Sequence, residues 1–238
     1  MSVASSDKPV LECPPLAGGH RMEPNDRLIT KKEEWARLKR GLVEEGVTQD
    51  LRPRRDRLPP GQHVTKGLPV LDLGIHPEID PATWTLTVGG SVERPLTWTW
   101  RDFLSQPQTQ IVSDFHCVTT WSTFDNEWTG VAFRHLLHLA RPRPEARFVF
   151  FTSYDGYTTN LPLDACDDED VLLAATWNGE PLPREHGGPA RVLVPKRYAW
   201  KGAKWVKTIT FLEQDRPGYW EVRGYSNTAL PWDEDRYG

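Results

Sequence analysis

The runs of this chain that have the character of β-strands are short, and stretches rich in proline and glycine separate them. The 238 residues include 21 prolines and 18 glycines, and both residue types favour turns between short elements. Several runs alternate or are rich in β-branched and aromatic residues, which is typical of strands. These runs are residues 84–92, 147–153, 191–195 and 206–212. The pattern predicts a domain of short strands joined by long loops.

Helical patterning is confined to a few places in the same part of the chain. Residues 99–104 and 131–140 have apolar side chains at helical spacing. A hydrophobic content of 38% and an aromatic content of 11% are enough for a globular core. We therefore expect an α+β fold that is dominated by strands, with helices at its periphery.

The N-terminal part of the chain differs from the rest. Residues 1–57 are predicted to form an extension, and residues 58–238 to form the main domain. Within the extension, residues 28–42 have an amphipathic pattern that starts at Thr30, a possible N-cap, and predicts a short helix packed on the main domain. A basic linker rich in proline follows this helix.

Charge and hydropathy exclude several classes of protein. The formal net charge is −4 and the isoelectric point is near 6.0, which argues against nucleic acid as the main partner. No stretch approaches the 18 or so apolar residues of a membrane span. The N-terminal sequence has no apolar signal region, so we expect a cytoplasmic protein. The cysteines, which are odd in number and unpaired in spacing, fit a reducing compartment; they are Cys13, Cys117 and Cys166.

Cys117 stands in a polar and aromatic stretch, D-F-H-C-V-T-T-W at 114–121. A single cysteine is by default a small buried hydrophobe, but these polar neighbours suit a loop that presents the thiol. A catalytic Cys–His pair is a poor fit with His116, because adjacent residues on a strand point to opposite faces. A zinc site would need about four ligands, and no cluster supplies them. A metal held within an organic cofactor would need only one thiolate.

A basic stretch follows at 178–207. Its glycines would let backbone N–H groups approach an anion, and basic side chains on such a loop suit a phosphate. Aromatic residues are interleaved with the charges and favour the wall of a partly buried pocket. The basic residues are Arg184, Arg191, Lys196, Arg197, Lys201, Lys204 and Lys207, and the aromatic ones are Tyr198, Trp200 and Trp205.

Several spaced motifs together resemble one known family. They are H-C-V-T-T-W-S, W-T-G-V, S-Y-D-G-Y, H-G-G-P-A-R-V-L-V-P and K-G-A-K-W-V, in this order. Residues 58–236 are similar to the molybdopterin domain of the sulfite oxidase superfamily. Within it, the nearest likeness is to small cytosolic members and to the catalytic subunit of protein-methionine-sulfoxide reductase. The resemblance implies an oxidoreductase that holds molybdenum on molybdopterin.

The resemblance also implies roles for individual residues. Cys117 matches the thiolate that ligates molybdenum, where a soft donor can tune the redox potential. Asp155 and Tyr157 would lie close to the metal as catalytic candidates, and Trp121 could join Tyr157 as an apolar wall. The positions that match cofactor-binding residues are His63, Ser153, His186, Arg191, Gly202, Ala203 and Lys204.

The chain departs from the classical sulfite oxidases in ways that bear on the substrate. The segment after Cys117 lacks the arginine that helps those enzymes bind an oxyanion, and it contains Asp125 and Glu127. We therefore expect oxygen-atom transfer with a small sulfoxide or N-oxide rather than sulfite. A separate protein would exchange the electrons, and a monomer is expected because the dimerisation domain of classical members is lacking.

Two other functional classes stay open at the level of sequence. One is a cofactor-free, tryptophan-rich binding module, and the other is a hydrolase that depends on Cys117. The acidic run at 167–170 fits a solvated loop, with a docking patch for a basic electron-transfer protein as the alternative.

Overall fold

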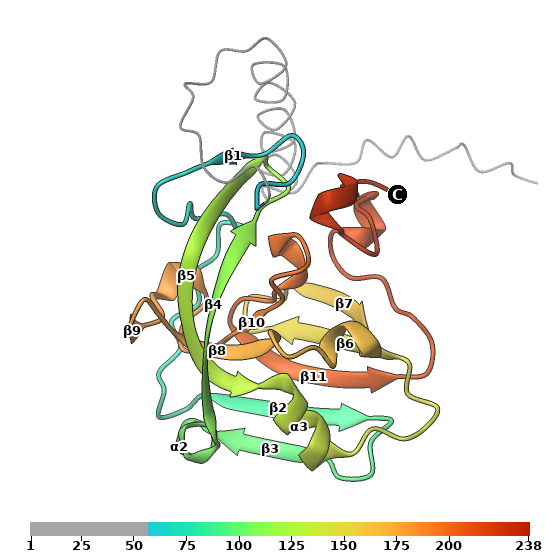
Figure 1. The fold of residues 1–238 in the computed structure, drawn as a ribbon. Helices are drawn as coiled ribbons and strands as arrows, with labels where there is room; N and C mark the ends of the chain where they lie inside the picture. The colour runs from blue at the N-terminus through green and yellow to red at the C-terminus, as the bar shows by residue number, and fades with distance from the viewer. Residues whose placement is uncertain (1–56) are drawn as a thin grey trace, which may run out of the picture.

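Residues 57–238 are described by a computed structural model, in which the chain forms two mixed β-sheets and several short helices (Figure 1). The strand-dominated α+β fold expected from the sequence is confirmed. The helix expected at 28–42, most of the basic linker and Cys13 lie outside the described residues.

The first sheet is built around a long hairpin. Strands β4 and β5 pair along most of their length and run through the height of the molecule in Figure 1. Within the described residues, this sheet has six strands in the order β1-β5-β8-β10, with β4 also on β5 and β9 also on β8. The pairs are antiparallel except β1 with β5. The strands are β1 (His63–Val64), β4 (Gln108–His116), β5 (Trp121–Ala132), β8 (Leu172–Trp177), β9 (Glu180–Pro181) and β10 (Arg191–Leu193).

The second sheet brings together strands from both ends of the domain. Its order is β3-β2-β11-β6-β7, so the late strand β11 lies between the early strands β2 and β6. Strands β2 and β11 are parallel, and the other pairs are antiparallel. The strands are β2 (Thr85–Gly90), β3 (Leu96–Thr99), β6 (Phe148–Ser153), β7 (Thr158–Pro162) and β11 (Val206–Leu212).

The helices are short. Helix α2 begins with a capping box, in which Thr99 and Asp102 each accept a hydrogen bond from the other's backbone N–H. The α-helices are α2 (Trp100–Ser105), α3 (Phe133–Ala140) and α4 (Leu163–Cys166). The 3-10 helices are η1 (Arg184–His186), η2 (Ala199–Lys201), η3 (Glu221–Arg223) and η4 (Pro231–Asp233).

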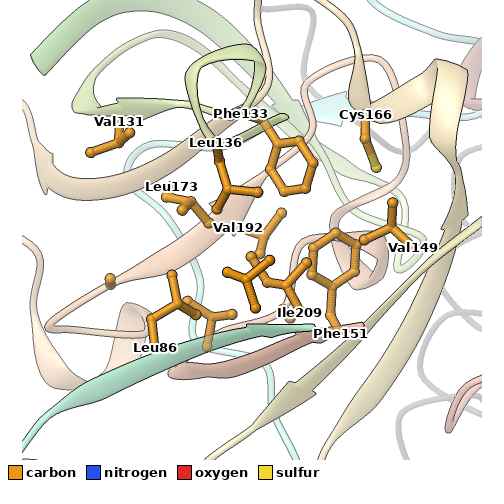
Figure 2. Packing of buried hydrophobic residues seen from close by; sticks show 14 of the residues in the cluster. Leu86, Val131, Phe133, Leu136, Val149, Phe151, Cys166, Leu173, Val192 and Ile209 are labelled. Atoms are coloured by element: carbon orange, nitrogen blue, oxygen red, sulfur yellow. The ribbon is translucent and has the colours of Figure 1, made fainter. Parts of the chain in front are cut away.

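The main hydrophobic core lies between the two sheets (Figure 2). Side chains of the second sheet meet side chains of the first sheet and of helix α3, and all of these are fully buried. Burying a large aliphatic or aromatic side chain contributes about 1.5–3 kcal/mol each. Members of this core are Leu86, Val131, Phe133, Leu136, Val149, Phe151, Cys166, Leu173, Val192 and Ile209.

The structure corrects the prediction around 131–140. Val131 and Ala132 continue strand β5, because they pair with Leu173 and Leu172 of β8, and helix α3 begins only at Phe133. The strand β5 itself was not predicted, since its residues mix polar and aromatic types without clean alternation.

Candidate active site

Cys117 lies at the tip of the hairpin formed by β4 and β5. His116 and Ser122 are the last paired residues, and beyond them the Cys117 N–H donates to the carbonyl oxygen of Trp121 at 2.9 Å. The chain turns back through Thr120, whose φ of 71° lies in the left-handed region. The tip therefore holds the thiol at a defined point at the end of a long, paired element.

The thiol of Cys117 faces a cavity that encloses about 900 Å³ of empty space, part of it open to solvent. Cys117 itself is 6% exposed, and its Sγ lies 3.2 Å from Oγ1 of Thr119. Trp121 and Tyr157 both line the cavity, as expected from the sequence. Other apolar lining residues are Leu68, Leu71, Phe115, Trp200 and Tyr225.

Two carboxyl groups, Asp72 and Asp155, line the same cavity. Asp72 is compensated: its Oδ2 lies 2.7 Å from Nε2 of His76 and 3.4 Å from Nζ of Lys204. Burial alone would raise the pKa of Asp72, but the Gly74 N–H, the Lys204 ammonium and the His76 ring together lower it. Asp72 is therefore held as the ionised partner of Lys204.

Asp155 stands in a different environment. It follows β6 in the turn toward β7, and its Oδ1 accepts the N–H of Tyr157 at 3.0 Å. Burial raises the pKa of Asp155; the Tyr157 N–H opposes this shift only in part, and the charge of Asp72 adds to it. The pKa values of the two carboxyl groups in this cavity are thus shifted in opposite directions. Such an arrangement makes Asp155 a candidate proton donor and keeps Asp72 as a fixed negative charge.

Arg191 is a buried cation on β10 at the cavity. Its guanidinium donates to the carbonyl oxygens of His186 at 3.1 Å and Gly202 at 3.3 Å, and it lies 5.2 Å from the ring of Phe115. Burial lowers the pKa of Arg191 to about 10. Among residues 57–238, its contacts are with carbonyls and rings rather than with a carboxylate. A buried cation of this kind suits an anion that enters from the cavity.

Gly202 and Lys204 continue the cavity wall beside Arg191. A Cβ at Gly202 would lie 2.7 Å from the carbonyl oxygen of Val192, so this position has no room for a side chain. Nζ of Lys204 donates to the Glu185 carbonyl at 2.7 Å. Ala203 is fully buried in the core between these two residues.

The structure places the remaining candidates at different depths. His186 lines the cavity, and burial lowers the pKa of its ring. Ser153 and His63 do not line the cavity. Ser153 is buried at the end of β6, and its hydroxyl has no hydrogen-bond partner in the described residues. His63 lies on β1, where it pairs with Trp121 of β5.

Tyr157 contributes its ring to the wall. Its hydroxyl donates to the carbonyl oxygen of Trp200 at 2.5 Å, and burial raises its pKa well above that of an exposed tyrosine. The hydroxyl is therefore a structural donor that fixes Trp200, while the ring shapes the cavity.

Two acids that the sequence associated with the site, Asp125 and Glu127, lie elsewhere. The side chain of Asp125 is 70% exposed and pairs with Arg57 at 2.9 Å, and neither Asp125 nor Glu127 lines the cavity. The acids that do so are Asp72 and Asp155. Sequence reasoning missed Asp72; the only signal was a lone acid inside the apolar stretch L-P-V-L-D-L-G at 68–74.

The basic stretch divides in a similar way. Of its cations, Arg191 and Lys204 reach the cavity, whereas Lys201 is buried against Glu221 at 2.6 Å. Lys196 pairs with Asp168 at 2.6 Å. Asp167 of the same acidic run pairs with Arg134, so much of the run's charge is already neutralised by neighbours.

Comparison with known proteins gives a consistent result. The family described as oxidoreductase molybdopterin binding domain matches residues 73–220. The oxidoreductase YuiH of Bacillus subtilis is 42% identical over 182 residues, which cover 76% of this chain and 92% of that protein. The protein-methionine-sulfoxide reductase catalytic subunit MsrP of Campylobacter jejuni is 30% identical over 155 residues, 58% of this chain but only 52% of that relative.

A solved structure supports the fold. The sulfane dehydrogenase SoxCD from Paracoccus pantotrophus superposes with a TM-score of 0.54 at 26% identity, covering 58% of this chain and 40% of that one. In the described residues, no helix combines the length and the apolar character needed to cross a membrane.

The residues at the cavity fit molybdopterin. Cys117 offers a soft thiolate for molybdenum, and Arg191 is a buried cation whose contacts within residues 57–238 are carbonyl oxygens and aromatic rings. The protein is therefore an enzyme with a molybdenum cofactor rather than a cofactor-free binding module or a hydrolase. The chain belongs to the oxidoreductase molybdopterin binding domain family.

Proposed function

We propose that this oxidoreductase reduces a small neutral oxo compound, a sulfoxide or an N-oxide, with two electrons from a separate donor protein. The observation that carries the proposal is the cavity beside Cys117, in which an apolar wall stands next to the carboxyl of Asp155. Among the described residues, Asp155 forms no ion pair within 4.0 Å, and its carboxyl lines the cavity.

The reaction needs protons as well as electrons. Reduction of a sulfoxide consumes two electrons and two protons and releases the sulfide and water. The molybdenum cofactor bound at Cys117 supplies two-electron oxygen-atom transfer. Asp155 holds one of the protons on the oxygen that does not accept the Tyr157 N–H, and its raised pKa favours that protonated state.

The charges around the cavity disfavour an oxyanion substrate. Lys204 is compensated by Asp72, and the cofactor's own anionic group would engage Arg191. A negatively charged substrate such as nitrate or sulfite would then meet an apolar wall, with no uncompensated cation left for it among residues 57–238. Small neutral molecules pay no such penalty and pack against Trp121 and the other apolar side chains of the wall.

The relatives support this substrate class. The MsrP proteins are sulfoxide reductases by name and match this chain at up to 31% identity. The three cysteines of this chain are too far apart for a C-x-x-C-H haem attachment, so a separate carrier fits as the source of electrons.

The test uses protein purified from a host with intact pterin synthesis. Metal content is compared between the wild type and Cys117→Ser. Reduced methyl viologen then drives the reduction of dimethyl sulfoxide, trimethylamine N-oxide or nitrate, and ferricyanide accepts electrons from sulfite. We expect about one molybdenum per chain, with the neutral acceptors turned over faster than nitrate or sulfite. Faster sulfite oxidation would overturn the proposal.

Asp155 has its own comparison. Asp155→Asn should lower the reductase rate by roughly 100-fold, the scale of a lost general acid, with the molybdenum content unchanged. Asp168→Asn, a change in an ion-paired surface carboxylate, is the matched control and should leave the rate unchanged. Equal rates for the wild type and Asp155→Asn would remove Asp155 from the reaction.

A further inference from the structure

The hairpin tip that carries Cys117 is held from outside the hairpin. Tips of hairpins fray easily because few contacts fix them, yet three carbonyl oxygens of this tip accept hydrogen bonds from segments remote in sequence. The contacts are Gln62 Nε2 to Cys117 O at 3.1 Å, Arg236 Nη1 to Val118 O at 2.8 Å, and His63 N to Thr120 O at 2.9 Å.

Arg236 brings a charged donor into this set. It is 2% exposed, and its guanidinium lies 5.1 Å from the ring of Tyr198. Nη2 reaches the carbonyl oxygen of Pro60 at 3.4 Å and Oε1 of Glu234 at 3.5 Å. The guanidinium of Arg236 thus links the hairpin tip at Val118 to the segment around Pro60, which precedes strand β1. Hydrogen bonds from a charged donor are about twice as strong as neutral ones.

The surroundings of the Arg236 side chain are tightly packed. Gly61 has a φ of +64°, and a Cβ there would lie 2.6 Å from Oε1 of Glu234 and 3.2 Å from Nη2 of Arg236. The neighbours of Arg236 are also fixed, because Tyr225 and Tyr237 form an isolated antiparallel bridge. Tyr225 lines the cavity, so the segment that clamps the tip also contributes to the wall.

We propose that Arg236 is a positioning residue for Cys117, acting through the Val118 carbonyl. A metal ligand must be held to within a fraction of an ångström by groups around it. The C-terminal segment supplies such a contact, the charged hydrogen bond from Arg236 to the Val118 carbonyl oxygen at 2.8 Å. The inference concerns the position of the thiol, and it holds for any substrate of the enzyme.

The test measures how often the tip opens in cofactor-free protein. Wild type, Arg236→Met and Arg236→Lys are treated with iodoacetamide, and alkylation of each cysteine is followed by mass spectrometry of its peptide. Methionine keeps an apolar chain against Tyr198 but removes the donors. We expect Cys117 to react roughly tenfold faster in Arg236→Met, the scale of one lost charged hydrogen bond, and at an intermediate rate in Arg236→Lys.

Cys166 serves as the internal control. It is fully buried in the core, and burial raises the pKa of its thiol far above that of a free cysteine, so it reacts only when the whole domain unfolds. Faster reaction of Cys117 alone supports the proposal. Parallel acceleration of Cys117 and Cys166 would show a general loss of stability and would overturn it.

A matched variant and a spectrum complete the experiment. Arg216 also stacks on an aromatic ring, that of Phe150 on β6, at 4.3 Å, so Arg216→Met should leave the reactivity of Cys117 unchanged. In cofactor-loaded protein, Arg236→Met should shift the sulfur-to-molybdenum absorption band, whereas Arg216→Met should not. An unshifted band together with unchanged Cys117 reactivity would refute the role of Arg236.

Discussion

The buried ion pair of Lys201 and Glu221 allows a quantitative test of the fold. Nζ of Lys201 lies 2.6 Å from Oε1 of Glu221, with the two side chains 0% and 2% exposed. Nζ also donates to the backbone and side-chain oxygens of Asn160 at 3.1 and 3.2 Å. Replacing lysine by methionine removes the cation and leaves the Glu221 carboxylate buried without it. Breaking one partner of such a pair costs roughly 3–5 kcal/mol.

This cost is a large part of the stability of a domain, which is about 5–15 kcal/mol. Urea unfolding followed by circular dichroism measures it directly. With a slope near 2 kcal/mol per molar, Lys201→Met should lower the urea midpoint by roughly 1.5–2.5 M. The double variant Lys201→Met with Glu221→Gln should recover much of this loss, because no unpaired charge is then left in the interior.

A surface pair of the same length provides the control. Nζ of Lys196 also lies 2.6 Å from a carboxylate oxygen, that of Asp168, but the two side chains are 60% and 30% exposed. Solvent screens such a pair, so Lys196→Met should cost about 0–1 kcal/mol. Equal midpoint shifts for Lys201→Met and Lys196→Met would refute the argument that burial, not distance, sets the cost.

Three further changes test other parts of the structure. Asp155→Asn should raise the stability at pH 7, because burial raises the pKa of this carboxyl and so penalises its ionised form in the folded state. The gain in urea midpoint should vanish below about pH 4, where Asp155 is protonated in the unfolded chain as well. A gain that persists at pH 3 would contradict this reasoning. Gly130→Ala should cost about 2 kcal/mol or more, because the Cβ would lie 2.0 Å from the Leu173 carbonyl oxygen, whereas Gly89→Ala, which enters open space, should shift the melting temperature little. Arg191→Met should leave the cofactor-free protein at least as stable as the wild type, because a buried cation without a carboxylate is costly. The molybdenum and pterin retained after gel filtration should fall about tenfold. Full retention would exclude Arg191 as an anchor of the cofactor.

Local patterns predicted the elements whose side chains alternate between core and solvent. Strand β2 has buried residues at Leu86 and Val88 with more exposed neighbours between them, which gives the period of two that a sequence displays directly. Helix α2 was placed near Thr99 because its apolar spacing is helical. Both patterns are local, so they can be recognised in the sequence without knowledge of the rest of the fold.

Strand β5 was missed because partners on both sides decide its course. It pairs with β4 over most of its length and with β8 at its end, so polar residues such as Asn126 are buried on it. Asn126 accepts a hydrogen bond from Nε1 of Trp177 at 3.0 Å, a contact 51 residues apart in sequence. Such burial of a polar group depends on a distant donor and leaves no periodic signal.

The candidate site could be predicted only where a spaced motif marks it. Cys117, Arg191 and Lys204 stand in motifs that resemble the family and do line the cavity. Asp72 lies in a segment without strand or helix, and only the folded chain brings it to within 3.4 Å of Lys204. Sequence therefore selected a cysteine and two basic residues that do line the cavity but missed Asp72, the acid that pairs with Lys204.

The motif K-G-A-K shows why counting charges in a sequence misjudges an anion site. Lys201 and Lys204 are three residues apart, and a count of charges treats them as equal. Gly202 turns the chain between them, so Lys201 points into the interior against Glu221 and Lys204 points to the cavity beside Asp72. Both cations already have carboxylate partners, which leaves Arg191 as the cation of this stretch that is buried at the cavity against carbonyls and rings. The affinity of the cavity for an anionic group should therefore depend on Arg191 far more than on the number of lysines around it.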